Sequence, residues 1–269
     1  MAIRRKQKTL RPVLANAGIA ASYRRKLRAV IQEMADEYEA ALTEQYEDKP
    51  PVMARDATPA RDLDRELRRL GDRWRKRINA AAPKLADWFR RAAQNRSDAA
   101  LRKILRDAGM TVRFQMTAGM RDVVDAVVAQ QVALIKSIPE QYHSQVSGLV
   151  QRSVTEGRDL SFLSRELRDR YGITQRRANF ISLDQNQKAT TALRRVRELD
   201  LGLEKEDEKN GIWLHSHAGK NPRPTHVKQH GKRFSVRNGW RDPATGKIIW
   251  PGTEPGCRCS WRIAVRGFS

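Results

Sequence analysis

Cysteine is scarce in this sequence, with Cys257 and Cys259 as the only two among 269 residues. Two closely spaced cysteines exclude the disulfide framework of a small secreted domain. No apolar run approaches the roughly 18 residues that a membrane helix needs. The charged N-terminal segment is followed by no apolar stretch typical of a signal peptide, so we expect no standard secretion and no membrane partner. Aromatic residues make up only 6% of the chain, which predicts a modest core and much solvated surface.

Acidic residues are also underrepresented, since 53 Lys and Arg face 31 Asp and Glu and leave a formal charge of +22. Such a charge points to a polyanionic partner, most often nucleic acid, although an anionic membrane or an acidic protein surface fits the same electrostatics. The excess lies at both ends: residues 1–28 contain nine basic residues and no acid, and residues 211–269 contain eleven against two.

The candidate DNA contacts lie in these two segments. They are Arg4, Arg5, Lys6, Arg24, Arg25, Lys26, Arg28, Arg223, Lys228, Lys232 and Arg233. Phosphate contacts from such residues are independent of base sequence and weaken with salt. The alternatives are that the charges simply solvate the surface, or that the first helix docks onto a partner subunit.

Apolar residues recur every three or four positions through most of the first 200 residues, which predicts amphipathic helices. We expect Pro83 to end or kink one helix and Pro139 to start another, with stops at Gly109, Gly157 and Gly172. The expected helices span 17–45, 58–83, 97–108, 123–135, 139–156, 161–171 and 174–199.

The last quarter of the chain follows a different pattern. GIWLHSH, the segment 226–234 and the alternating residues 260–265 predict strands, with turns at Asn238-Gly239 and Thr245-Gly246. The fold class is therefore α+β, a mainly α-helical body with a small C-terminal antiparallel β module. The expected divisions are a basic disordered arm over 1–15, helical regions over 16–130 and 131–203, and the β-rich module over 210–266.

Metal-ligand types are concentrated in this module. Zinc takes four Cys or His ligands in structural sites, so zinc is the candidate cofactor, although the sequence requires none. The candidate ligands are His215, His217, His226, His230, Cys257 and Cys259. The alternatives are that the two cysteines form a disulfide, or that they pack as small apolar residues while the histidines bond to turns. Cys257 with His226 also suggests a nucleophile and base, and the histidines near Asn221 suggest a metal nuclease, but the spacing selects neither, and we predict no catalytic residue.

The tryptophans of the module have two possible roles. We expect Trp213 and Trp261, on predicted strands, to lie in its core. For Trp240 and Trp250, in predicted loops, core packing and a stacking platform for bases both remain open.

Several short motifs occur in a fixed order over residues 134–265. They are Arg177-Ala178, Trp213, Arg223-Pro224-Thr225-His226, Gly231 to Phe234, and Cys257-Arg258-Cys259. In this order they resemble the phage head morphogenesis family, the Mu F-like minor head proteins of tailed phages. The family helix often contains Ala-Arg-Asp-Gln where this chain has Ser182-Leu183-Asp184-Gln185, so the family's arginine is missing.

The resemblance implies a minor capsid protein that enters the procapsid in few copies. It further implies assembly in the host cytoplasm, a place inside the virion capsid, and contact with the portal protein, other capsid proteins and double-stranded DNA. A non-catalytic role follows from the same resemblance. The competing interpretation is a DNA-binding or DNA-processing enzyme with a metal in the terminal module, and a third is an anchored scaffold.

Overall fold

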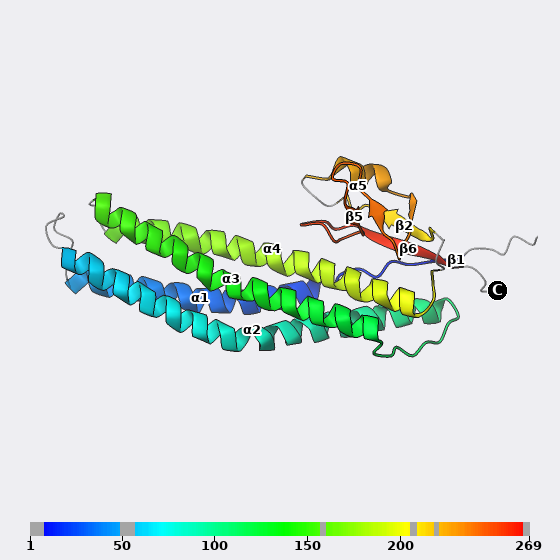
Figure 1. Cartoon of the computed structure of the whole chain (residues 1–269), viewed down its shortest axis with the longest axis horizontal. Coiled ribbons are helices and arrows are strands. Elements are labelled where there is room, and N and C mark those ends of the chain that lie inside the picture. Colours follow the sequence, from blue (N-terminus) through cyan, green and yellow to red (C-terminus); the bar gives the residue numbers. More distant parts are fainter. Residues whose placement is uncertain (1–7, 49–56, 157–159, 205–208, 218–220, 266–269) are drawn as a thin grey trace, which may run out of the picture. The chain divides into compact units, whose positions relative to one another are not determined.

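The computed structural model describes residues 8–48, 57–156, 160–204, 209–217 and 221–265. It is 68% helical, with five helices and a small antiparallel sheet in the described residues, which confirms the α+β prediction. The helices are α1 (Ala17–Asp48), α2 (Ala57–Asp107), α3 (Ala118–Glu156), α4 (Leu160–Asp200) and α5 (Pro224–Gln229). The strands are β1 (Lys8–Leu10), β2 (Gly211–Leu214), β3 (Arg233–Phe234), β4 (Trp240–Arg241), β5 (Ile248–Ile249) and β6 (Ser260–Val265) (Figure 1).

The four long helices are more continuous than their sequence predicts. Pro83 lies inside α2 and Pro139 inside α3, so neither ends nor starts a helix, and Gly172 lies within α4. Proline removes one backbone hydrogen bond, but tertiary packing overrides this local cost. Beside Pro83, Ala82 and Ala86 are fully buried, so the apolar face of α2 continues through the proline.

The predicted stop at Gly109 is confirmed. Gly109 has φ 90°, and the N–H of Met110 donates to the carbonyl of Leu105 at 2.9 Å just beyond the end of α2. This is the C-terminal arrangement in which glycine is favoured because it adopts a left-handed conformation without steric cost.

The chain divides into two compact units. The second unit comprises residues 21–87 and 129–182, where segments of all four long helices run side by side (Figure 1). Its core includes Tyr38 and Tyr142, whose rings meet edge to face at 5.5 Å. The Tyr38 hydroxyl lies 2.9 Å from His143 Nδ1, and a Cβ on Gly71 would lie 2.8 Å from the same ring. Glycine therefore lets α2 accommodate the imidazole.

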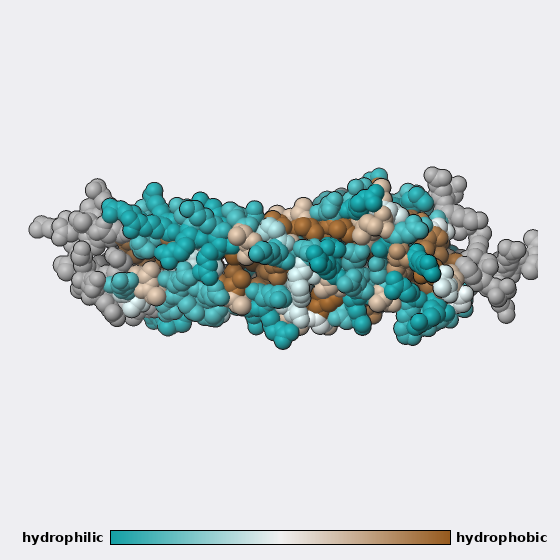
Figure 2. Space-filling model, turned by 90° about the horizontal axis from the view of Figure 1, so that it is seen from below, coloured by the Kyte–Doolittle hydropathy of each residue, from teal (hydrophilic) through white to brown (hydrophobic). Residues whose placement is uncertain are grey.

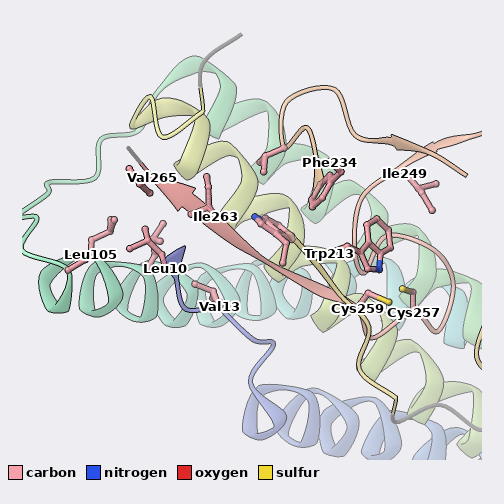
Figure 3. Packing of buried hydrophobic residues seen from close by; sticks show 14 residues of the cluster. Leu10, Val13, Leu105, Trp213, Phe234, Ile249, Cys257, Cys259, Ile263 and Val265 are labelled. Atoms are coloured by element: carbon pink, nitrogen blue, oxygen red, sulfur yellow. The ribbon is translucent and has the colours of Figure 1, made fainter. Parts of the chain in front are cut away.

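The first unit comprises residues 1–20, 88–128 and 183–269 and contains the sheet. Its strand order is β1-β6-β2-β3, all antiparallel, and β4 and β5 form a separate hairpin. Trp213 of β2 pairs with Trp261 of β6, and both side chains are buried, as the sequence predicts. They pack with Phe234, Ile263 and their neighbours into the core cluster shown in Figure 3.

The N-terminal segment corrects the expectation of a disordered arm over 1–15. Lys8–Leu10 pairs with Ile263–Val265 of β6, and Leu10 and Val13 are buried in the core cluster (Figure 3). The Lys8 ammonium donates to the carbonyl of Ala108 at 3.2 Å. A strand of three residues is too short to produce a recognisable pattern, and only its partner β6 defines it. Residues 1–7 lie outside the described part of the chain.

The surface matches the amphipathic pattern. Hydrophilic residues cover most of the face shown in Figure 2, with smaller apolar areas between them. Among the described helices, none combines the length and the apolar character that a bilayer crossing requires.

Candidate functional site

His226 lies on α5, where the sequence analysis placed a strand. The helix begins after Arg223 with Pro224 in its first turn, a position that proline favours because it needs no N–H partner there. Arg223 donates to the carbonyl of Pro255 at 2.9 Å and so connects the start of α5 to the segment before Cys257. Strand β3 covers only the last two residues of the predicted strand, Arg233 and Phe234.

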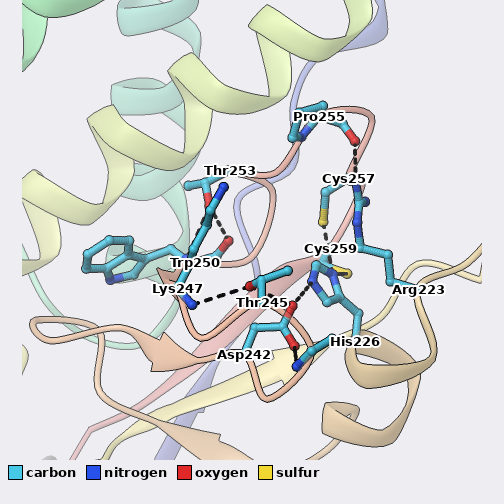
Figure 4. Close-up of polar contacts among 11 residues, drawn as sticks. Arg223, His226, Asp242, Thr245, Lys247, Trp250, Thr253, Pro255, Cys257 and Cys259 are labelled. Carbon is cyan, nitrogen blue, oxygen red and sulfur yellow. Dashed lines mark hydrogen bonds and ion pairs between the residues drawn. The ribbon is translucent and has the colours of Figure 1, made fainter.

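Both cysteines face His226. Cys257 Sγ lies 3.5 Å and Cys259 Sγ 3.8 Å from His226 Nδ1, while Arg258 between them is exposed (Figure 4). The two sulfurs and the imidazole nitrogen lie within 4.8 Å of one another, and all three residues are buried. The cysteines form no disulfide. Cys257 and Cys259 therefore lie on the same face of their segment, toward His226.

Asp242 lies behind the imidazole. Its Oδ2 is 4.0 Å from His226 Nε2, and both side chains are 2% exposed. The carboxylate also accepts hydrogen bonds from the Ala244 N–H at 3.1 Å and the Thr245 hydroxyl at 3.4 Å, so the turn at Thr245-Gly246 fixes it. His226 Nε2 has no hydrogen-bond partner among the described residues.

The two thiols differ in acidity. The hydrogen bond from Cys259 lowers the pKa of Cys257 to about 4, against the opposing effect of burial, and the contact with His226 acts in the same direction. The same hydrogen bond to Cys257 raises the pKa of Cys259, and burial raises it further. Loss of the proton from Cys257 therefore disfavours loss of a second proton from Cys259.

The other three histidines among the candidate ligands, His215, His217 and His230, form a separate and more exposed group. The His215 and His217 rings lie 4.5 Å apart, and His217 lies 5.3 Å from His230. The predicted strand GIWLHSH ends at Leu214, before its two histidines, and His217 has φ 53°. The six candidate ligands thus separate into His226, Cys257 and Cys259 in one group and three histidines in another. Burial and the neighbouring His217 lower the pKa of His215.

A polar stripe on α4 holds the cysteine segment in place. It consists of Asp184, Gln187, Thr191, Arg194 and Glu198, spaced three and four residues apart. Asp184 Oδ1 accepts from the N–H of Gly256 at 2.7 Å, Gln187 donates to the carbonyl of Cys259 at 3.0 Å, and Thr191 donates to that of Pro251 at 3.0 Å. The apolar periodicity of the helix, from which α4 was predicted, does not reveal this stripe. The repeated spacing of polar residues in a helix with a buried face was the available signal.

Arg194 and Glu198 complete the stripe as a buried ion pair. Their side chains are 1% and 0% exposed, with Arg194 Nε 2.6 Å from Glu198 Oε1. Arg194 also donates to the carbonyl of Trp261 at 2.9 Å, and the indole of Trp261 donates to Glu198 at 2.7 Å. Burial lowers the pKa of Arg194 and raises that of Glu198.

Glu204, in the loop after α4, is buried although it begins an acidic segment. Its carboxylate is 2% exposed and accepts from the backbone N–H groups of Val236 and Arg237. Residues 205–208 lie outside the described part of the chain.

The candidate DNA contacts lie in different parts of the fold. Arg24, Arg25, Lys26 and Arg28 lie on α1 in the second unit, whereas Arg223, Lys228, Lys232 and Arg233 lie in the first unit. Arg223 and Arg233 each donate to a backbone carbonyl, so they have a structural contact. Lys228 and Lys232 are exposed. Arg4, Arg5 and Lys6 lie outside the described residues.

Trp240 and Trp250, both predicted to lie in loops, are half-buried against the core cluster, and Trp240 belongs to β4. The Trp240 ring lies 5.2 Å from that of Trp213, and Trp250 donates to the carbonyl of Val236 at 2.8 Å while Arg195 covers its ring at 3.9 Å. Both indoles therefore pack against the core, which is the first of the two roles that the sequence left open.

Fold and site together define an α+β protein in which a long helix holds a small β module with a buried Cys/Cys/His group. Residues 144–262 match the family described as Phage Mu protein F like protein. Over this part of its length the chain is similar to the phage Mu F-like family, and the matched range lies within the resemblance seen in the sequence. It contains the α4 stripe and all three residues of the buried group.

A curated protein of Haemophilus influenzae, described as "Uncharacterized protein", is 28% identical over 150 residues. These residues are 56% of this chain and 31% of the relative, so the chain spans about a third of the relative's length. No solved structure matches.

Proposed function

We propose that the chain is a minor capsid protein of a tailed phage that enters the procapsid in few copies and binds the portal protein. The observation that carries this proposal is the match over residues 144–262, because the Mu F-like family suggests head morphogenesis, other capsid proteins as partners and a place in the virion. The proposed location is the capsid interior, after assembly in the host cytoplasm.

DNA is the second proposed partner. A formal charge of +22 gives the protein a strong attraction for a polyanion, and the packaged genome is the polyanion present inside a phage head. Lys228 and Lys232 are exposed in the first unit, and Arg25, Lys26 and Arg28 are exposed on α1. Contacts of this kind are made to phosphates, so we expect binding without sequence preference.

The role is proposed to be structural rather than catalytic. Burial of Cys257, Cys259 and His226 favours architecture over reaction with a macromolecular substrate, because a nucleophile must reach its substrate. The competing interpretation, a metal-dependent DNA-processing enzyme, predicts nicking of supercoiled plasmid by the purified protein with divalent cations. We expect the plasmid to stay intact.

Portal binding is tested by co-expressing the untagged chain with the tagged portal protein of the same phage. We expect the chain to co-purify with the portal, and a chain that stays in the unbound fraction would contradict the proposal. Arg177→Ala is the test variant, because Arg177 belongs to the family motif. Asp64→Asn is its control, because Asp64 lies outside the matched residues.

DNA binding is tested by fluorescence anisotropy with duplexes of unrelated sequence. We expect Kd to rise at least about tenfold between roughly 50 and 200 mM salt. Replacing Lys228 and Lys232 together with Gln is expected to reduce the salt slope, by about 0.9 for each lost phosphate contact. Lys76→Gln, at an exposed lysine of α2, is the control. Affinity that does not change with salt would refute phosphate-driven binding.

A further inference from the structure

The three convergent atoms of the β module have the spacing of a metal site. Zn–S bonds of about 2.3 Å and Zn–N bonds of about 2.0–2.1 Å at tetrahedral angles place sulfur and nitrogen about 3.6 Å apart. The two S–N distances here are 3.5 and 3.8 Å. We propose that Cys257 Sγ, Cys259 Sγ and His226 Nδ1 bind one zinc ion.

The hydrogen bonds of a neutral imidazole leave this arrangement incompletely satisfied. An imidazole nitrogen has one lone pair, so Nδ1 accepts one hydrogen bond although two sulfurs approach it. If Nδ1 instead carries the proton, Nε2 becomes an acceptor that faces the Asp242 carboxylate at 4.0 Å, another acceptor. A cation between the two sulfurs and Nδ1 removes both conflicts, because it binds all three donor atoms and leaves the proton on Nε2.

Asp242 supplies the outer contact that such a site requires. Histidines that bind metal through one ring nitrogen usually direct the other N–H to a carboxylate or carbonyl, which fixes the tautomer. Oδ2 of Asp242 faces Nε2 of His226 in this way, and both side chains are buried (Figure 4). The turn at Thr245-Gly246, which holds Asp242, thus becomes part of the site.

The fourth coordination position faces a cavity of about 40 Å³, lined by His215, Ser216, Asn221, Arg223 and the residues around the three ligands. A water molecule needs roughly 10–15 Å³ of such space, so one water fits as the fourth ligand. Two thiolates, one imidazole and a tetrahedral arrangement favour zinc over the harder cations, which prefer oxygen.

The proposed zinc joins segments that are distant in sequence. His226 comes from α5, the cysteines from the segment before β6, and Asp242 from the β4–β5 hairpin. The segment between β3 and β6 contains only the two-residue strands β4 and β5, so a metal cross-link adds to the few strand hydrogen bonds that hold it. The ion has a structural role in this account, and it is independent of whether the chain binds portal or DNA.

The test uses the full chain without a histidine tag, purified under reducing conditions from zinc-supplemented medium. We expect about one zinc per chain by elemental analysis, two thiols that react with a thiol reagent only after chelation, and, after exchange into cobalt, thiolate-to-cobalt charge transfer with intense tetrahedral d–d bands. These readouts come from the wild-type chain, so they stand even if a variant fails to fold.

Three variants assign the ligands. Cys257→Ser is expected to lose the zinc and the charge-transfer band, and Asp242→Asn to bind it about 10–100-fold more weakly. His217→Asn is the matched control, since it removes an exposed imidazole of the second group while Asn tolerates the positive φ. It is expected to retain the zinc.

Several results would overturn the proposal. They are a wild-type chain without zinc after reconstitution, a Cys257–Cys259 disulfide in the reduced preparation, or zinc that persists in Cys257→Ser and disappears in His217→Asn. Failure to find the protein in phage heads would leave the zinc result unchanged, because metal content is measured on the isolated chain.

Discussion

The buried pair of Arg194 and Glu198 provides a quantitative test of how α4 holds the β module. Replacing Glu198 with Gln removes the charge that faces Arg194 but keeps an oxygen that accepts from the indole of Trp261. The guanidinium then remains buried without a counter-charge. Breaking a buried ion pair in this way costs about 3–5 kcal/mol.

The pKa shifts of the pair indicate what the double variant does. Burial raises the pKa of Glu198 and lowers that of Arg194, so for both residues desolvation outweighs the mutual attraction. Arg194→Met with Glu198→Gln removes both charges and keeps an apolar chain over Trp261. We therefore expect the double variant to be more stable than the Glu198→Gln single variant, by at least about 1 kcal/mol.

The assay is urea unfolding followed by tryptophan fluorescence, with the midpoint and slope fitted for each variant. The control is Asp64→Asn, which breaks an i,i+4 ion pair of similar distance, 2.8 Å, whose side chains are 75% and 39% exposed. That exposed pair contributes less than about 1 kcal/mol. If Glu198→Gln costs no more than Asp64→Asn, or if the double variant is the least stable of the set, the assigned role of the pair is wrong.

Three further predictions concern other parts of the fold. Gly252→Ala should destabilise strongly, because φ is 87° and the new Cβ would lie 2.6 Å from Gln187 Nε2, whereas Gly246→Ala, at φ 70° in open space, should cost only about 1–2 kcal/mol by thermal unfolding. Leu10→Ala should cost about 2–5 kcal/mol by urea unfolding if β1 belongs to the core, and Leu14→Ala, 65% exposed, less than about 0.5 kcal/mol. Burial, and to a lesser extent the charge of Arg75, lowers the pKa of His143 below 6.5. The stability that the neutral ring contributes is therefore present above pH 6.5 and is lost as the pH falls toward the pKa of the folded state. His143→Gln should flatten that part of the pH–stability curve, and an unchanged curve would count against this role of the ring.

Amphipathic periodicity predicted most of what can be predicted from local sequence. The local pattern of apolar and polar side chains is enough to predict the helical body, the last strand Ser260–Val265 and the burial of Trp213 and Trp261. The wrong helix boundaries at Pro83, Pro139 and Gly172 have a common cause. Each residue weakens a helix locally, but tertiary packing decides whether the helix continues, and packing depends on partners distant in sequence.

The types of residue in the candidate site were predictable from the sequence, but which of these residues come together was not. Six residues had ligand chemistry, and nothing in their spacing separates His226 from His215 or His230. The separation depends on α5, which turns His226 inward, and on the end of β2 before His215. Asp242 was invisible as a partner of His226 because sixteen positions along the chain give no distance in space. The resemblance to the Mu F-like family could be recognised without a structure, because it depends only on the order of short motifs along the sequence.

The most direct test of the proposed function is the number of copies of this chain in purified procapsids. Quantitative mass spectrometry with isotope-labelled peptides, referenced to the major capsid and portal proteins of the same particles, measures it. We expect the chain to be present in far fewer copies than the major capsid protein and to remain after high-salt washing. Procapsids that assemble with portal but contain none of this chain would contradict the account.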